Sequence, residues 1–441
     1  MSSVKPFNIL IFAIMTWLGV GILLPWNLFL NSYGFWMYRF SANQTAWEDP
    51  SIESSQNFYQ SFWTSFLGVA MMGVASIFII INSALAGKFT FSLRIYFSLV
   101  CILLCCIWLM VMTFIDTFSW YQIFFVIMLI NATIQQGTGG ILQGAIFEFS
   151  GAFPEIYFSG MLQGQAIAGI LTSVLAILPI MVMKKELIGS DGKTYEVVDQ
   201  DQAATLYFAM AVGCNFFTIF AYWLLMRLSI SKEILKETNS SEKTKFSLSN
   251  WSSDCARLSK QLWMPYFSMW LNYAITLAVF PSVCQLIESG CESDSNYCKN
   301  IGKNKELFSA IFTFVMFNFC DWLGRFSAGV VQIFKPSQQF LILVCVFLRL
   351  VPTVLLMFGN VYGKGGLIGL GSDVAYVIIM VVFGVTNGYF ASLPNQHVPL
   401  LVDSTDIATA CGLVPLFLTF GCLCGSGFSF AAVAIVQLMY N

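Results

Sequence analysis

Residues 311–333 read IFTFVMFNFCDWLGRFSAGVVQI, an apolar run that contains one acid and one base. Asp321 and Arg325 stand four residues apart, and Asn318 lies one turn earlier. On a helix these three positions share one face. Charged groups at membrane depth are costly and are retained mainly where they line a water-filled path or a binding site. This stretch therefore predicts a membrane protein whose interior handles a polar solute.

The composition of the whole chain agrees with this prediction. The 441 residues are 57% hydrophobic and 10% charged, whereas soluble domains carry about 25% charged residues. A membrane-spanning helix needs about 20 predominantly apolar residues, and eleven stretches of the chain satisfy this. We therefore expect an all-α membrane protein with eleven transmembrane helices. The expected spans are 7–29, 62–87, 93–115, 119–147, 158–183, 204–226, 263–287, 306–333, 338–359, 374–394 and 408–438.

A polar segment divides the spans into six before it and five after it. Residues 229–262 are rich in Lys, Glu, Ser and Asn, and we expect them to form a flexible cytoplasmic linker. The expected units are an N-terminal six-helix bundle (1–228), the linker loop (229–262) and a C-terminal five-helix bundle (263–441). This layout is typical of major-facilitator-type transporters, in which two bundles rock around a site near the membrane midplane.

An odd number of spans places the two termini on opposite sides of the membrane. With a cytoplasmic N-terminus, eleven Lys and Arg residues fall inside and eight outside, which agrees with the positive-inside rule. The same orientation puts the glycosylation sequon at Asn43 outside, together with Cys291 and Cys298, where a disulfide could persist. We expect a multi-pass protein of the plasma membrane with an extracellular C-terminus.

Further polar residues fall inside the apolar spans, where they need hydrogen-bonding partners. They include Asn131, Gln135, Gln136, Gln165, Arg349 and Asn387. Small residues at four-residue spacing predict close helix packing at Gly140/Gly144, Gly160/Gly164 and Gly421/Gly425. One histidine and no CxxC pair argue against a metal site, and we expect no cofactor.

Six motifs occur in order along the chain. They are PWN at 25–27, GILQG at 140–144, GQAIAG at 164–169, DWLGR at 321–325, RLVP at 349–352 and NGYFASL at 387–393. Over essentially its whole length the chain resembles the equilibrative nucleoside transporter family. The resemblance implies an eleven-helix fold related to the major facilitators. It also implies facilitated diffusion of purine and pyrimidine nucleosides, sometimes nucleobases, across a lipid bilayer, with no nucleic acid as partner.

The resemblance implies roles for residues at matching positions. Asp321 and Arg325, with Asn318 beside them, would line a central cavity near the ribose. Trp26 and Gln143 would lie near the nucleobase. The other implied site residues are Asn27, Leu30, Gly139, Gly164, Phe280 and Phe314, of which Leu30 matches by position only.

The chemistry of these side chains suits a nucleoside. Ribose hydroxyls donate hydrogen bonds to a carboxylate such as Asp321 and accept them from a guanidinium such as Arg325. A nucleobase offers a flat face for Trp26 and edge groups that the amide of Gln143 can read as donor and acceptor.

Structural roles remain open for the same residues. The D-x-x-G-R pattern also resembles a major-facilitator gating motif, in which Asp321 and Arg325 would lock helices together. Trp26 could pack in the core, and Gln143 could hydrogen-bond between helices. We expect Arg349 to be an ion-pair partner within a bundle. We expect Glu148 in a short inner loop and His397 exposed in a cytoplasmic loop.

A uniporter is the expected mechanism, and the protein is not expected to be an enzyme. Proton-driven carriers need a group that changes charge inside the membrane, and Arg325 should keep Asp321 ionised. Cation-transporting relatives carry an acid where this chain has Gln165, which favours neutral nucleosides. The alternatives are a carrier of another small neutral solute, a proton-coupled nucleoside carrier and a transport-inactive receptor.

Overall fold

The computed structural model is almost entirely helical and describes residues 7–41, 57–85, 88–229, 231–232, 248–291, 297–298 and 305–440. The first half of the chain forms α1 (Ile9–Asn31), α2 (Tyr33–Arg39), α4 (Phe58–Leu85), α5 (Phe91–Met112), α6 (Tyr121–Gly151), α7 (Glu155–Val182) and α8 (Gln200–Arg227). The second half forms α10 (Leu248–Gln261), α11 (Trp263–Val279), α12 (Lys305–Phe308), the π-helix η4 (Ser309–Val315), α13 (Met316–Val330), α14 (Gln339–Leu348), α15 (Leu350–Met357), α16 (Asp373–His397) and α17 (Ile407–Tyr440).

Several helices start before their apolar runs because a polar residue caps them. The Asp199 side chain accepts a hydrogen bond from the Gln202 amide, so α8 begins at Gln200, four residues earlier than expected. Thr90 caps α5 in the same way through the amide of Leu93. Such caps satisfy amides that have no partner within the helix.

In the part of the chain that the structure describes, nine helices are long and apolar enough to cross a membrane. Among the described side chains of α4 the apolar stretch Met71–Ala84 is shorter, and the helical run that ends in α13 consists of α12, η4 and α13 in succession. A multi-pass membrane protein is therefore confirmed. The number of eleven spans and their six-plus-five division stay predictions.

The outer helices present large apolar side chains to their surroundings. Leu104 on α5 is 60% exposed, Phe216 on α8 is 68% exposed and Phe340 on α14 is 62% exposed. Exposed apolar surface of this extent marks an interaction site in a soluble protein. On every side of a helical bundle it suits contact with lipid.

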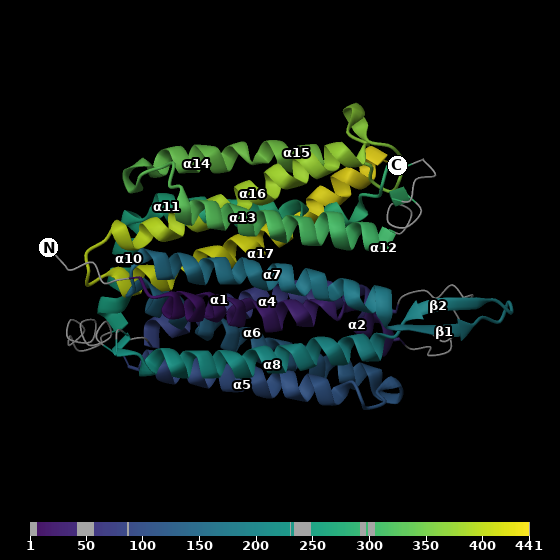
Figure 1. Cartoon of the computed structure of the whole chain (residues 1–441), viewed down its shortest axis with the longest axis horizontal. Coiled ribbons are helices and arrows are strands. Elements are labelled where there is room, and N and C mark those ends of the chain that lie inside the picture. Colours follow the sequence, from purple (N-terminus) through teal and green to yellow (C-terminus); the bar gives the residue numbers. More distant parts are fainter. Residues whose placement is uncertain are drawn as a thin grey trace.

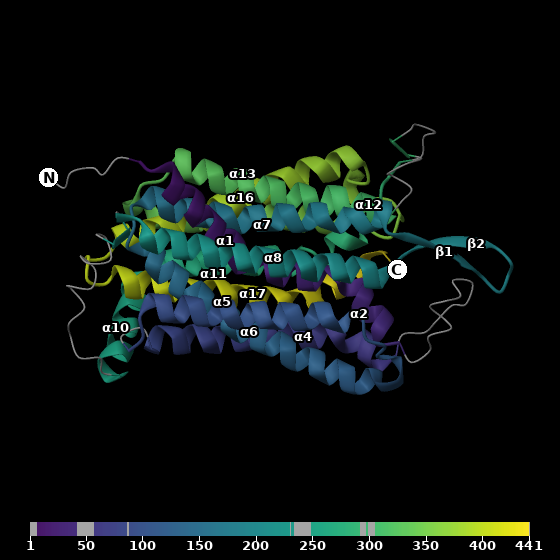
Figure 2. The ribbon, with the colours of Figure 1, turned by 60° about the horizontal axis from the view of Figure 1, so that its bottom comes forward.

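The long helices lie side by side, and the chain enters and leaves the helical body at opposite ends (Figure 1). At one end, here the linker end, lie α10 and the start of α1; at the other, the hairpin end, lie a β-hairpin and the end of α17 (Figure 2). The two halves of the chain meet where α17 packs on α4 and α6 and where α7 packs on α13.

Glycines allow these helices to approach closely, as their spacing predicts. A Cβ on Gly140 would lie 2.8 Å from the carbonyl oxygen of Ala75 on α4. A Cβ on Gly164 would overlap the carbonyl oxygen of Thr16 on α1. Gly425 faces Ala274 on α11 in the same manner, with 2.7 Å to its carbonyl oxygen.

The prediction of an all-α chain is wrong in one detail. Between α7 and α8, strands β1 (Lys184–Ile188) and β2 (Thr194–Val198) form an antiparallel hairpin in which Lys184 pairs with Val198. Gly192 in its turn has a φ of +75°, a conformation that glycine adopts without strain. The β-branched residues of β2 favour a strand.

The prediction of a flexible linker is also wrong for its second part, because residues 248–261 form α10. Leu258 is fully buried, and the Trp251 indole donates to Ser83 Oγ of α4 at 3.2 Å. Arg257 forms an ion pair with Asp406 at 2.9 Å. The amphipathic sequence thus packs one face of α10 against the bundle.

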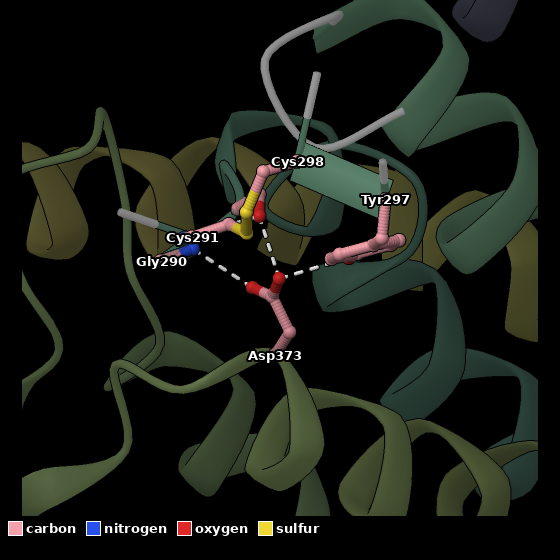
Figure 3. The surroundings of a disulfide bond; sticks show 6 residues. Gly290, Cys291, Tyr297, Cys298 and Asp373 are labelled. Carbon is pink, nitrogen blue, oxygen red and sulfur yellow. Dashed lines mark hydrogen bonds between the residues drawn. A yellow bond between two sulfur atoms is a disulfide. The ribbon is translucent and has the colours of Figure 1, made fainter. Parts of the chain in front are cut away.

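A disulfide joins Cys291 and Cys298 at the hairpin end, with 5.8 Å between their Cα atoms (Figure 3). Asp373, the first residue of α16, accepts hydrogen bonds from the Gly290 amide at 2.7 Å and the Tyr297 hydroxyl at 2.9 Å. Burial and the bond to Asp373 raise the pKa of Tyr297 to about 12. Tyr297 therefore keeps its proton at neutral pH. The expected sequon at Asn43 lies outside the described residues.

Two polar residues expected in loops are buried in helices. Glu148 belongs to α6 and forms an ion pair with Arg94 of α5 at 2.8 Å, while Asn82 of α4 bonds to both at 3.0 and 2.8 Å. His397 ends α16, is fully buried and shares a 2.9 Å hydrogen bond with Gln339. Each of these helices continues past the end of its apolar run because a side chain of a neighbouring helix, Arg94 or Gln339, bonds to the polar residue there.

Candidate functional site

Asp321 and Arg325 face the protein interior from one side of α13. The Arg325 Nε donates to Asp321 Oδ2 at 2.8 Å, across one helical turn. The two residues are only 5% and 6% exposed. Neither side chain is directed to lipid, so the predicted shared face exists and is internal.

Neighbouring helices complete the surroundings of Asp321. The Asn387 amide on α16 donates to Asp321 Oδ1 at 2.6 Å. The Asn387 Oδ1 in turn accepts from Asn272 Nδ2 at 3.1 Å and from the Thr276 hydroxyl at 2.7 Å, both on α11. The Asn387 side chain thereby joins α11, α13 and α16, and both oxygens of the Asp321 carboxylate are engaged.

Arg349, between α14 and α15, is held by neutral oxygens. Its Nη1 donates to the Asn272 carbonyl at 3.0 Å, its Nη2 to Thr276 Oγ1 at 2.9 Å and its Nε to Thr386 Oγ1 at 3.2 Å. Across the described ranges no carboxylate forms an ion pair with it. The expectation of an ion-pair partner is therefore wrong, because Asp321 already engages Arg325 and Asn387.

The charged pair also reaches the other half of the chain. Arg325 Nη1 donates to the Leu162 carbonyl of α7, in the first half, at 3.5 Å. Its Nη2 donates to the Tyr273 hydroxyl of α11, in the same half as Arg325, at 3.2 Å. One turn away, the Asn318 amide donates to Ser173 Oγ of α7 at 2.8 Å. The pair thus lies where the two halves meet.

A partly open cavity of about 460 Å³ lies between the halves toward the hairpin end. This volume is within the range of small-ligand pockets, about 300–1,000 Å³. The π-helix η4 supplies part of the wall, and π-helical turns are frequent at functional sites. The wall includes Asn31 of α1, Ser173 and Ile180 of α7, Gln285 after α11, and Ser309 and Phe314 of η4.

The structure brings together five of the residues singled out in the sequence. Phe314 lines the cavity, and Asn318 touches its wall through Ser173. Phe280 stacks on Phe317 with 4.0 Å between ring centroids and meets Phe314 edge-on at 5.7 Å. Asp321 and Arg325 follow along the same helical run.

The other predicted site residues lie in the first half of the chain. Trp26, Asn27 and Gln143 are half-buried, and their side chains make no hydrogen bond with any residue that the structure describes. Trp26 stacks on Phe29 with 5.6 Å between ring centroids. Leu30 is 43% exposed.

The two glycines proposed for the site differ from each other. Gly164 packs directly against Thr16 and Gly19 of α1. Gly139 is less crowded, since the nearest described atom to an added Cβ would be Gln136 Oε1, at an ordinary contact distance of 3.5 Å. Gly164 therefore serves helix packing, and Gly139 leaves room beside α6.

Sequence reasoning missed several polar residues of the site. Asn272 is a fully buried amide inside an apolar span, so the rule that singled out Asn387 applies to it equally. Tyr273 and Thr276 carry weaker signals because tyrosine and threonine are common in such spans. Asn31 and Gln285 stand at the ends of apolar runs, where a polar residue is expected whether or not it belongs to a binding site.

The fold and the site define a multi-pass helical membrane protein with a cavity between the two halves of the chain. Crystal structures of the E. coli fucose:proton symporter FucP superpose with a TM-score of 0.52 at 13% identity, over 97% of each chain. A second FucP structure, in the outward conformation, gives the same TM-score at 14% identity over 97% of this chain and 92% of that one. At this identity the likeness concerns the fold alone.

The sequence comparisons identify the family. The model of the nucleoside transporter family matches residues 124–434, and the chain belongs to that family. It is 27% identical to Equilibrative nucleoside transporter 1 of Rattus norvegicus, over 95% of this chain and 96% of that protein. Equilibrative nucleoside transporter 2 of the same species is 25% identical over the same shares. Equilibrative nucleotide transporter 1 of Arabidopsis thaliana is 22% identical over 93% and 83%.

Proposed function

We propose that the protein carries nucleosides, and to some extent nucleobases, across a membrane by facilitated diffusion. Family membership together with a cavity between the two halves carries this proposal. The cavity wall combines amide and hydroxyl groups with an aromatic ring, which suits a neutral solute that has a flat base and a polar sugar.

The proposed topology has eleven spans. The helix α4 and the continuous run α12–η4–α13 complete the nine helices that satisfy length and hydropathy. Residues 1–228 then form a six-helix bundle and residues 263–441 a five-helix bundle, joined by 229–262.

In the proposed orientation the linker end is cytoplasmic and the hairpin end extracellular, at the plasma membrane. The excess of Lys and Arg in the linker supports a cytoplasmic position. The disulfide between Cys291 and Cys298 at the opposite end supports an oxidising compartment there.

The proposed substrate contacts extend from the cavity into the polar network. Asp321 and Arg325 bind the ribose hydroxyls, with Asn318 between them and the cavity. The unpaired groups of Trp26 and Gln143 contact the base, and Asn27, Leu30, Gly139, Phe280 and Phe314 border the path. The half-buried state of Trp26, Asn27 and Gln143 supports a path on their side of α1 and α6.

Transport proceeds by alternating access. At the linker end the halves touch, because Gln396 Nε2 donates to Ser159 Oγ at 3.2 Å and Gln332 bonds to Glu155. At the hairpin end a partly open cavity lies between the halves, beside the contact of α7 with η4. Breaking the contacts at the linker end while the cavity closes would release the substrate on the other side.

Uptake by purified protein in liposomes tests this function. We expect saturable uptake of radiolabelled uridine and adenosine that unlabelled nucleosides inhibit and hexoses do not. An imposed pH gradient should leave the initial rate unchanged, as for a uniporter. A rate that follows the proton gradient and vanishes in Asp321→Asn would overturn the uniport mechanism, and an absence of saturable flux would overturn nucleoside transport itself.

A further inference from the structure

The cavity at the hairpin end carries two amides that no substrate role has yet used. Asn31 is the last residue of α1, and Gln285 follows α11 in the short helix η2 (Cys284–Leu286). They approach the cavity from opposite halves of the chain. We propose that Asn31 and Gln285 form an outer subsite that reads the edge of the nucleobase before the substrate reaches Asp321. This inference rests on the proposed function.

Asn31 presents a fixed acceptor to the cavity. Its Nδ2 donates to the Thr172 carbonyl of α7 at 2.7 Å, which orients the amide. The Oδ1 accepts no hydrogen bond from any described residue, and Asn31 is half-buried at the wall. An oriented amide oxygen with free lone pairs is ready to accept from a base N–H or amino group.

Gln285 supplies both kinds of group from the other half. Its side chain is exposed and makes no hydrogen bond with the part of the chain that is described. A free carboxamide donates and accepts at adjacent positions. Nucleobase edges alternate donors and acceptors in the same way, which is why Asn and Gln pair with adenine in two-point contacts.

The rest of the wall suits a flat, neutral ring. Ile180 and Phe314 provide apolar contact, and the edge-on packing against Phe280 fixes the Phe314 ring. Aromatic rings are favourable partners for flat faces. None of the eight residues described as lining the cavity is ionisable, so a phosphate would be desolvated without a counter-charge. The subsite therefore selects nucleosides over nucleotides.

The subsite is distinct from the polar network around Asp321. That network is buried, and its members bond to one another. Asn318 and Ser173 separate the two regions, since Ser173 lines the cavity and accepts from Asn318. A nucleoside bound with its base between Asn31 and Gln285 bridges the two halves, so this contact also favours the state in which the cavity is open.

Substitution of the two amides tests the inference by uptake from the hairpin side. The variants are Asn31→Leu, Gln285→Leu and the isosteric Gln285→Glu, which keeps acceptors but loses the donor. Gln122→Leu is the matched control, because Gln122 is an exposed amide at the hairpin end of α6 and outside the cavity. The probes are radiolabelled uridine, uridine monophosphate and a riboside whose base is replaced by a phenyl ring.

We expect each cavity variant to raise the half-saturating concentration of uridine about three- to tenfold, the effect of one lost hydrogen bond. Inhibition by the phenyl riboside should be unchanged in every variant, because it has no edge groups to lose. Uridine monophosphate should not compete in the wild type. Gln122→Leu should behave as the wild type in all assays.

Equal shifts for uridine and the phenyl riboside, or no shift for uridine in Gln285→Glu, would overturn the subsite. Competition by the monophosphate as strong as by uridine would overturn the selection against phosphate. These outcomes require a wild type that transports uridine. A wild type with no saturable nucleoside uptake would instead overturn the proposed function, and the subsite with it.

Discussion

Asp321 and Arg325 satisfy each other and still retain capacity for a substrate. A carboxylate offers about four lone-pair positions and a guanidinium five N–H groups. Asp321 uses its oxygens on Arg325 and Asn387, and Arg325 donates further to Tyr273. Sugar hydroxyls can therefore join the pair without separating it. The pair carries no net charge of its own, so neither of these two charges requires an opposite charge on the substrate.

Removing either charge should strongly reduce nucleoside transport. We expect Asp321→Ala and Arg325→Ala to reduce uridine uptake at least tenfold, because the remaining charge is left buried and unpaired, at a cost of about 3–5 kcal/mol. Uptake is measured at matched amounts of protein at the cell surface. Nucleobases, which have no ribose, should be affected less than nucleosides in the well-expressed variants. Equal losses for both would rule out a ribose contact.

Site residues can be predicted from the sequence where a polar group interrupts an apolar run. This pattern identified Asp321, Arg325 and Asn387, which the structure joins in one network. It failed for Glu148 and His397, which stand at the ends of apolar runs and are buried by neighbouring helices. The hydropathy of the sequence around Glu148 does not show that its ion-pair partner is Arg94, which lies 54 residues away.

Glycines set the spacing of the helices that carry the network. A Cβ on Gly388 of α16 would overlap the carbonyl oxygen of Asp321, and one on Gly324 of α13 would lie 2.7 Å from the amide nitrogen of Tyr389. These backbone atoms cannot move away from an added Cβ as the end of a flexible side chain can. The distance between Asp321 and Asn387 therefore depends on the absence of side chains at these two positions.

We expect Gly388→Ala and Gly164→Ala to destabilise the protein by about 1–3 kcal/mol or more through overpacking. Thermal unfolding of the purified protein in detergent measures the effect. Gly213→Ala on α8 is the matched control, because an added Cβ there meets nothing within 4 Å and alanine favours a helix. Its melting temperature should be equal to that of the wild type or higher. A Gly388→Ala variant as stable as this control would contradict the packing role.

The elements themselves were largely predictable, and their ends were not. Apolar runs placed the helices within a few residues, whereas capping residues such as Asp199 moved their starts. The hairpin of β1 and β2 and the helix α10 were missed because both lie in polar segments. There the decisive contacts are tertiary, such as Trp251 with Ser83.

The whole molecule is asymmetric along its length. At the linker end the halves are in contact through Ser159 with Gln396 and Glu155 with Gln332. At the hairpin end a partly open cavity lies between them, beside the contact of α7 with η4. The division into halves could be inferred from the polar segment 229–262. The difference between the two ends could not, because the same sequence must adopt every conformation of a transport cycle.

Locking the linker end should therefore stop transport while leaving the cavity accessible. Glu155 begins α7 and Gln332 follows α13, and their side chains meet at the exposed linker end of the interface between the halves. In Glu155→Cys/Gln332→Cys, a short reducible bifunctional thiol reagent should join the two halves. We expect uridine uptake to fall at least tenfold and to recover on reduction, whereas equilibrium binding of uridine persists. Each single-cysteine variant, treated alike, controls for the other cysteines of the chain. Full uptake by the cross-linked protein would show that transport needs no separation of the halves at this end, contrary to alternating access.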